Sequence, residues 1–153
     1  MQAATMEIRP ISIAEMHEHA QALLVAHWQE VGQEKHRRVL SPDWTRYYEA
    51  EEKNVLLAIG AWVDGELAGY SLNFVAYNMH YSEVLSCQND LLFVDEKHRR
   101  GSLGGRLIKA TERAAKNCGA HEMLWHAKPD TVLNDGLPKL GYSVLDIIHC
   151  KEL

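Results

Sequence analysis

The segment FVDEKHRRGSLGGRLI, residues Phe93 to Ile108, decides the fold of this chain. It runs from the end of an apolar strand through a charged loop into a glycine-containing turn, and an amphipathic helix begins directly after that turn. A strand end, a turn dense in backbone N–H groups and a helix N-terminus together form a site for a phosphate or pyrophosphate. The N–H groups point at the anion, and the helix dipole favours its negative charge.

The charge distribution supports the same interpretation. Seven basic residues and one acidic residue, Glu112, lie between Lys97 and Lys116, whereas the whole chain has a formal net charge of −5. The remainder of the chain is therefore strongly acidic. A basic segment of this kind in an acidic protein predicts a local anionic ligand, and it argues against nucleic acid as a partner.

Length and composition limit the class of protein. A chain of 153 residues with 46% hydrophobic and 24% charged residues is typical of a single globular domain, here residues 1–153. We expect no membrane span, because no run of about 18 apolar residues occurs, and no signal peptide, because the first ten residues lack its layout. Three cysteines without metal-like spacing favour reduced thiols, a cytoplasmic location and no bound metal.

Hydrophobic periodicity and turn signals predict the order of the elements. Ser12 and Glu15 form a capping box at the start of the first helix, and Asp64-Gly65 is a two-residue hairpin signal. This order predicts an α/β or α+β fold with a single mixed, mostly antiparallel central sheet flanked by helices. We expect strands at 6–11, 55–63, 66–77, 84–94, 122–127 and 142–150, and helices at 13–31, from 43 onward, at 103–118 and at 130–140.

Three short motifs follow one another along the chain. Arg99-Arg100-Gly101-Ser102-Leu103-Gly104 matches the pattern Q/R-x-x-G-x-G/A, with Ser102 in place of the first motif glycine. AWVDGELAGY, from Ala61 to Tyr70, covers two paired strands, and KLGY, from Lys139 to Tyr142, lies near the end. Together they resemble the GNAT superfamily of N-acetyltransferases, and the resemblance runs from Met6 to Cys150. Ser102 fits the turn if its φ is negative, because the ligand is held by backbone N–H groups.

The resemblance implies acetyl-CoA as donor and a primary amine as acceptor, and hence a CoA-dependent N-acetyltransferase that works by direct transfer. It implies that the pyrophosphate lies on the N–H groups of the turn. The pantetheine would pair with the backbone of Phe93 and Val94 where two strands splay apart, and the Val94 N–H would hold the tetrahedral oxyanion. The donor-binding residues it implies are Phe93, Val94, Arg99, Arg100, Gly101, Ser102, Leu103, Gly104, Gly105 and Asp130.

The chain departs from the family pattern at positions that handle protons. Leu137 stands where the family often has a tyrosine as general acid, and Gln88 stands where a glutamate base is common. Regular alternation places Gln88, Asp90 and Val94 on one face of their strand. Asp90 is therefore the first candidate for the general base, although a salt bridge or a cap would explain it equally well. Further candidates are His80, Tyr81 and His126.

Other interpretations stay open. The departures at Leu137 and Gln88 are compatible with a catalytically silent acyl-CoA-binding or protein-interaction module on the same fold. A Rossmann-type nucleotide site is disfavoured, because G-S-L-G-G is not G-x-G-x-x-G. The apolar terminal stretch VLDIIHC, residues 144–150, would leave an exposed strand that a partner chain can cover, which predicts a homodimer. The identity of the acceptor amine is not encoded in any motif of the chain.

Overall fold

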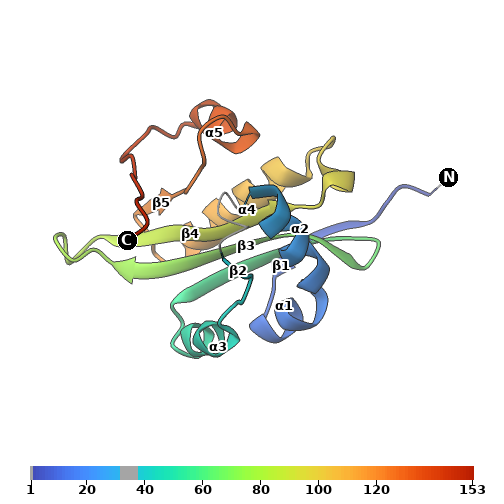
Figure 1. Ribbon diagram of the computed structural model, residues 1–153, viewed down its shortest axis with the longest axis horizontal. Coiled ribbons are helices and arrows are strands. Elements are labelled where there is room, and N and C mark those ends of the chain that lie inside the picture. The colour runs from blue at the N-terminus through green and yellow to red at the C-terminus, as the bar shows by residue number, and fades with distance from the viewer. Residues whose placement is uncertain (1, 32–37) are drawn as a thin grey trace.

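The computed structural model describes residues 2–31 and 38–153. Five strands and a series of helices follow one another in the order of Figure 1. The strands are β1 (Met6–Pro10), β2 (Leu56–Val63), β3 (Glu66–Tyr77), β4 (Leu85–Val94) and β5 (Glu122–Leu124). The helices are α1 (Ile13–His19), α2 (Gln21–Val31), α3 (Trp44–Glu52), α4 (Leu103–Asn117) and α5 (Val132–Gly136), with short 3₁₀ turns η1 (Glu96–His98) and η2 (Leu137–Leu140).

The strands form one mixed sheet in the order β1-β2-β3-β4-β5, in which β5 alone runs parallel to its neighbour β4. Helices α1, α2 and α3 cover one face of this sheet, and α4 covers the other (Figure 1). The predicted fold class, a mostly antiparallel sheet flanked by helices, is confirmed. Within the described residues, no helix combines the length and the apolar character needed to cross a membrane.

Two local predictions are also confirmed. Ser12 caps α1, its hydroxyl accepting from the Glu15 N–H while the Glu15 carboxylate accepts from the Ser12 N–H. Asp64 and Gly65 both have positive φ, 50° and 82°, as the two-residue hairpin between β2 and β3 requires. Gly69 of β3 allows β3 and β4 to approach closely. A Cβ at this position would lie 2.8 Å from the Phe93 carbonyl oxygen, so a larger residue would push the two strands apart.

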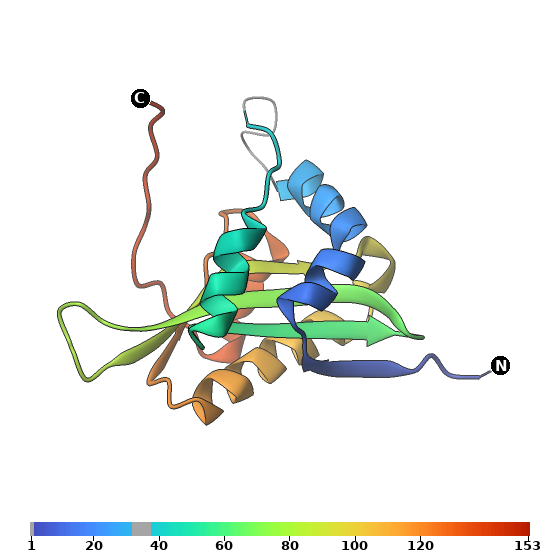
Figure 2. The ribbon, with the colours of Figure 1, turned by 90° about the horizontal axis from the view of Figure 1, so that it is seen from below.

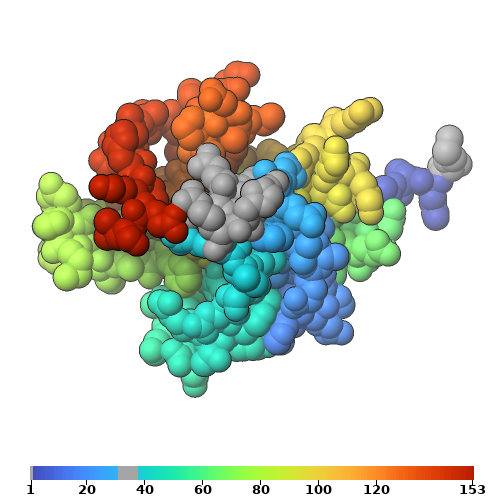
Figure 3. Space-filling view, viewed as in Figure 1, coloured from blue at the N-terminus to red at the C-terminus, as the bar shows by residue number. Residues whose placement is uncertain are grey.

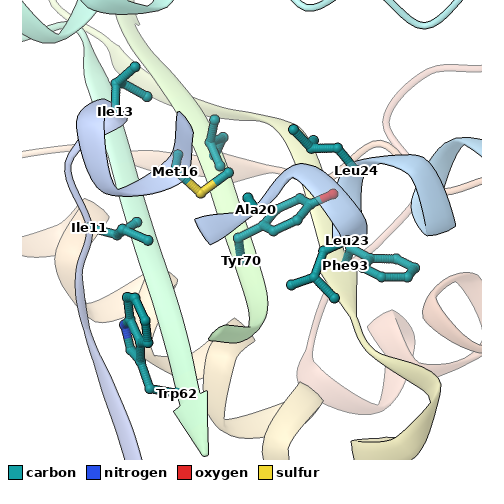
Figure 4. Packing of buried hydrophobic residues seen from close by; sticks show 10 residues of the cluster. Ile11, Ile13, Met16, Ala20, Leu23, Leu24, Trp62, Tyr70 and Phe93 are labelled. Atoms are coloured by element: carbon teal, nitrogen blue, oxygen red, sulfur yellow. The ribbon is translucent and has the colours of Figure 1, made fainter. Parts of the chain in front are cut away.

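The core lies in two layers, one on each face of the sheet. Between the sheet and α1–α2, Met16 and Ala20 pack against Tyr70, with Phe93 beside them (Figure 4). On the opposite face, Leu103 and Leu107 of α4 pack against β2 and β3. Burial of these two helix faces fixes α2 and α4 on either side of the C-terminal end of β4.

Three predicted elements differ from the structure. The helix expected over 13–31 is two helices, because Ala20 has φ −98° and ψ 0° and starts a new helix direction. Ala20 is fully buried, so the bend lets Met16 of α1 and Leu24 of α2 reach the same core. The expected strand 122–127 ends at Leu124, and the weak helix expected over 130–140 is divided into α5 and η2 at Leu137.

The prediction of a final strand over 142–150 is wrong. This segment is extended but belongs to no ladder of the sheet, and it runs away from the strands (Figure 2). Its apolar side chains lie on the surface: Val144 is 77% exposed and Ile148 is 80% exposed. A strand needs a backbone partner as well as β-forming side chains. The sequence contains the side chains, but the described residues of this chain do not supply the partner.

Candidate active site

The C-terminal end of β4 has an open backbone edge. The ladder between β4 and β5 covers only Ser86, Cys87 and Gln88, so β4 continues to Val94 beyond the pairing. The Asp95 N–H donates to the Ala68 carbonyl of β3 over 2.8 Å. Because successive N–H groups of a strand point in opposite directions, the Val94 N–H points away from β3, into the region where β4 and β5 separate. The predicted oxyanion donor therefore lies at this opening.

The turn after β4 carries the free N-terminus of α4. The first helical bond runs from the Arg106 N–H to the Ser102 carbonyl, so the N–H groups of Leu103, Gly104 and Gly105 have no acceptor inside the helix. Ser102 has φ −89°, a value open to any residue, so the serine in the motif imposes no strain. A Cβ on Gly105 would meet nothing within 4 Å. The space beside the Cα of Gly105 is therefore open.

Packing holds this turn against the end of β4. The Leu103 side chain is 1% exposed and forms part of the core beneath the sheet. A Cβ on the next residue, Gly104, would lie 4.0 Å from Cγ2 of Val94. The N-terminus of α4 therefore packs against the Val94 side chain.

The Arg99 side chain joins α2 to this region. Its Nη2 donates to Oε2 of Glu30 over 2.6 Å and its Nε donates to the Val94 carbonyl over 2.8 Å. The guanidinium also lies 5.1 Å from the centre of the Phe93 ring. The pair raises the pKa of Arg99 and lowers the pKa of Glu30, so both stay charged. Arg99, predicted to bind the donor, links α2 to β4 through these contacts. Arg100 lies in the turn, and both arginines are exposed.

The His27 side chain of α2 also packs on this end of β4. The His27 ring stacks on Phe93 at 4.8 Å, and its Nδ1 lies 2.9 Å from the Tyr70 hydroxyl. Burial lowers the pKa of His27 to about 4, and the positive charges of Lys128 and Arg99 act in the same direction. Burial also raises the pKa of Tyr70. Near neutral pH both side chains are therefore uncharged.

Asp90 lies in a β-bulge. Leu72 pairs with Leu91 and Asn73 with Asn89, so Asp90 is an extra residue in β4. Its carboxylate accepts a 2.6 Å hydrogen bond from the Tyr47 hydroxyl of α3, and burial raises the pKa of Tyr47, which keeps that hydroxyl protonated.

The bulge also changes which side chains share a face of β4. Leu91 packs in the same layer as Tyr47, whereas Val94 packs against the layer under α4. The expectation that Asp90 and Val94 share one face is therefore wrong, because the extra residue reverses the alternation after Asp90.

Two buried asparagines hold this bulge. The Asn89 amide donates to the carbonyls of Leu72 and Leu91, which lie across from the bulge and after it, and to Oδ1 of Asn73. Asn73 in turn donates to the Leu57 carbonyl and to Ser71 Oγ. Both asparagines are at most 3% exposed. They satisfy carbonyls around the irregular register and so determine where Asp90 points.

The remaining predicted residues lie in different places. His80 and Tyr81 lie in the β3–β4 hairpin, at the opposite end of β4 from Val94 (Figure 2). Nε2 of His126 lies 3.1 Å from Nε2 of Gln88. Asp130 is exposed, with φ 59°, just before the N-cap of α5. Leu137 is buried. No group of three metal-ligating side chains occurs in the described part of the chain.

Sequence reasoning missed several residues that shape this region. His27 and Tyr47 belong to no motif of the chain, so the sequence does not single them out. Asn73 and Asn89 carried a usable signal, because two amides inside apolar strands must find buried hydrogen-bond partners.

Comparisons with known proteins agree with this geometry. The model of the acetyltransferase (GNAT) family matches residues 14–142. Among solved structures, a ribosomal-protein-alanine N-acetyltransferase from Brucella melitensis biovar Abortus 2308 is 18% identical with a TM-score of 0.71, covering 97% of this chain and 99% of that chain. An aminoglycoside acetyltransferase from an uncultured soil metagenomic sample, solved with sisomicin, is 17% identical with a TM-score of 0.75, covering 97% and 95%.

An aminoglycoside N-acetyltransferase solved in complex with CoA is 19% identical to this chain with a TM-score of 0.70, and covers 99% of this chain and 97% of that chain. At these identities the likeness establishes the fold. Comparison with curated protein sequences found no match.

Proposed function

Because the chain belongs to the acetyltransferase (GNAT) family, we propose that it transfers an acetyl group from acetyl-CoA to a primary amine by direct attack. One observation carries this proposal: the Val94 N–H points into the opening between β4 and β5, beside the free N-terminus of α4. One structural neighbour was solved with CoA, which supports this choice of donor.

On this proposal the donor is held mainly by backbone. Its pyrophosphate lies on the N–H groups from Arg100 to Gly105, where the helix dipole and the open space around Gly101 and Gly105 favour an anion. The pantetheine runs along Phe93 and Val94, and Asp130 lies near its outer part. No metal is needed for this step, because the Val94 N–H stabilises the oxyanion as a hydrogen-bond donor.

The chemical step needs one proton to leave the amine, whose pKa in water is about 10. The amine nitrogen forms a bond to the acetyl carbon and the carbon–sulfur bond breaks, which leaves the CoA thiolate. Asp90 takes the amine proton, and Tyr47 orients its carboxylate. Asp90 is four residues from Val94, about 13 Å along the strand, so the proton travels through water. The thiolate takes a proton from solvent, since Leu137 has no hydroxyl.

The second candidate is a protein of the same fold that binds acyl-CoA without turnover. Leu137, which is buried and apolar, and Gln88, which cannot act as a base, favour it. The two candidates differ in the fate of the thioester, because only an enzyme consumes it when an acceptor is present.

The test has a binding arm and a turnover arm. Calorimetric titration with acetyl-CoA, with ATP as control, should give micromolar affinity for acetyl-CoA alone. Release of CoA thiol should then depend on an added amine, and Asp90→Asn should lower kcat/KM about 100-fold with unchanged acetyl-CoA affinity. Binding without amine-dependent thiol release would favour the silent module, and absence of binding would remove both candidates.

We also propose that two copies associate through the C-terminal segment 142–150, and that the protein works in the cytoplasm, as its cysteine usage indicates. Leu145, Ile147 and Ile148 of this segment are each at least 70% exposed. The C-terminal segment, red in Figure 3, lies on the surface of the molecule. β5 is a short edge strand of the sheet, so the segment of one copy can pair with the backbone edge of β5 in the other copy. A mass of two chains in light scattering, reduced to one by Ile147→Asp with Ile148→Asp, would support this, and a monomer at all concentrations would refute it.

A further inference from the structure

A cavity of about 360 Å³ lies between the sheet and the helices α1, α2 and α3. Leu72 and Leu91 of the sheet line one side of it. The other sides carry further large apolar groups, among them Leu24, Trp28, Leu40 and Trp44. A cavity of this size accepts a small organic molecule, and its lining favours one with an apolar body.

The cavity adjoins the residues assigned to the reaction. His27 lines it and stacks on Phe93, the residue next to Val94. Tyr47 lines it and donates to the Asp90 carboxylate. A molecule in this cavity therefore contacts Tyr47 and His27, the neighbours of the proposed base and of the proposed thioester site, and we take the cavity as the acceptor side of the site.

The charges of the described residues that line the cavity disfavour one large group of amines. The described residues that line it include no aspartate or glutamate, and they include two cationic side chains, Arg38 and Lys128. A polyamine or an aminosugar carries several positive charges, and each needs carboxylates or water to replace its hydration. The described lining residues offer no carboxylate to replace that hydration, so binding of a polycation is unfavourable.

Two aromatic side chains that line the cavity, Trp44 and Tyr47, are held in place by stacking on other rings. Trp44 stacks on the His17 ring at 4.4 Å, and Tyr47 stacks on Phe74 at 6.2 Å. Side chains fixed in this way lose little conformational entropy on binding. Their rings present flat apolar surfaces to a bound molecule.

We propose that the acceptor is a primary amine on a single apolar body, aromatic or branched aliphatic, and not a polycationic amine. This inference rests on the proposed acetyl transfer, because only that reaction makes the bound amine an acceptor. The preference of the cavity among amines can be measured without turnover. Burial of the apolar body supplies the binding energy, and the one amine stays at the edge near Asp90.

The probes are 2-phenylethylamine and 3-methylbutylamine as apolar amines, and spermidine and kanamycin as polycationic ones. With CoA-loaded protein, quenching of the fluorescence of Trp28 and Trp44 and calorimetry should give affinities for the apolar amines at least tenfold higher. If acetyl transfer is observed, kcat/KM should follow the same order. Equal or tighter binding of spermidine or kanamycin, or no binding of the apolar amines, would overturn the proposal.

A matched pair of variants locates the preference. Leu40→Asp places a carboxylate in the cavity, and Val25→Asp places the same group on the exposed outer surface of α2. Leu40→Asp should reduce the preference for 2-phenylethylamine over spermidine at least tenfold, and Val25→Asp should leave it unchanged. The same preference in both variants would show that another surface binds the amine. Failure of turnover with this pattern of binding intact would refute the proposed acetyl transfer and leave the cavity's assignment standing.

Discussion

At the N-terminus of α4 the proposed contacts to a ligand come from backbone N–H groups, whereas in the cavity beneath α2 and α3 they come from side chains. The first region therefore depends on glycine positions and on the start of a helix. The second depends on the identity of residues that lie far apart in the chain, such as Leu40 and Leu91. A backbone site tolerates many sequences, and a side-chain site changes with each substitution.

The difference has a consequence for how each region should respond to mutation. At the turn, a side chain matters only if it obstructs the N–H groups or changes the local charge. On the cavity side, a single replacement alters shape, polarity or the position of Asp90. The following experiments are designed to separate these two behaviours.

Gly105→Glu tests the backbone site most severely. It places a carboxylate beside the free N–H groups, in space that is open in the structure. Repulsion of the phosphate and competition for the N–H groups should cost about 3 kcal/mol, or roughly 100-fold in acetyl-CoA affinity. Calorimetry measures this, and Gly105→Gln, which adds the same bulk without charge, should lose much less. Equal losses would mean that space, not charge, governs the site.

Asn89→Leu tests whether the bulge depends on buried amides. It removes the donor to the Leu72 and Leu91 carbonyls and leaves the Asn73 amide oxygen without that partner. We expect a loss of about 2–3 kcal/mol in the free energy of unfolding, measured by urea denaturation. The exposed neighbour provides the control, since Gln88→Leu should change stability by less than about 0.5 kcal/mol. A tolerated Asn89→Leu would show that the register holds without this network.

The buried His27 side chain should make the free energy of unfolding depend on pH. The unfolded chain takes up a proton on this side chain near pH 6.5, whereas the folded protein does so only at about pH 4. The free energy of unfolding should therefore fall as the pH drops through this window, by about 2 kcal/mol after allowance for partial exposure. In His27→Phe, which keeps the stacking on Phe93, this part of the fall should be missing. An identical pH profile in both proteins would contradict the assignment.

The pair Arg99–Glu30 should give the smallest effect, since both side chains are partly exposed. A double-mutant cycle with Arg99→Gln and Glu30→Gln should yield a coupling free energy of about 1 kcal/mol in unfolding experiments. Acetyl-CoA affinity should fall by less than tenfold in either single variant, because the guanidinium holds α2 and β4 instead of the ligand. A loss of 100-fold or more would assign Arg99 to direct phosphate binding.

The sequence predicts most of the fold, and it also singles out the turn that is proposed to bind the donor, because both depend on local patterns. The Asp64-Gly65 hairpin, the Ser12 capping box and the glycine turn before α4 are each encoded within a few residues. The acceptor side depends on contacts across the sheet. Alternation alone could not reveal the bulge at Asp90. The apolar residues of 142–150 predicted a strand, although strand formation also requires a partner edge.

The paired asparagines under the bulge have an evolutionary consequence. They meet their hydrogen-bonding needs among themselves and the neighbouring carbonyls, whereas Asp90 contributes no buried apolar surface to the core. A substitution at position 90 therefore leaves this buried network in place and removes only the hydrogen bond from Tyr47, so the group displayed there can change in evolution while the asparagine scaffold is kept.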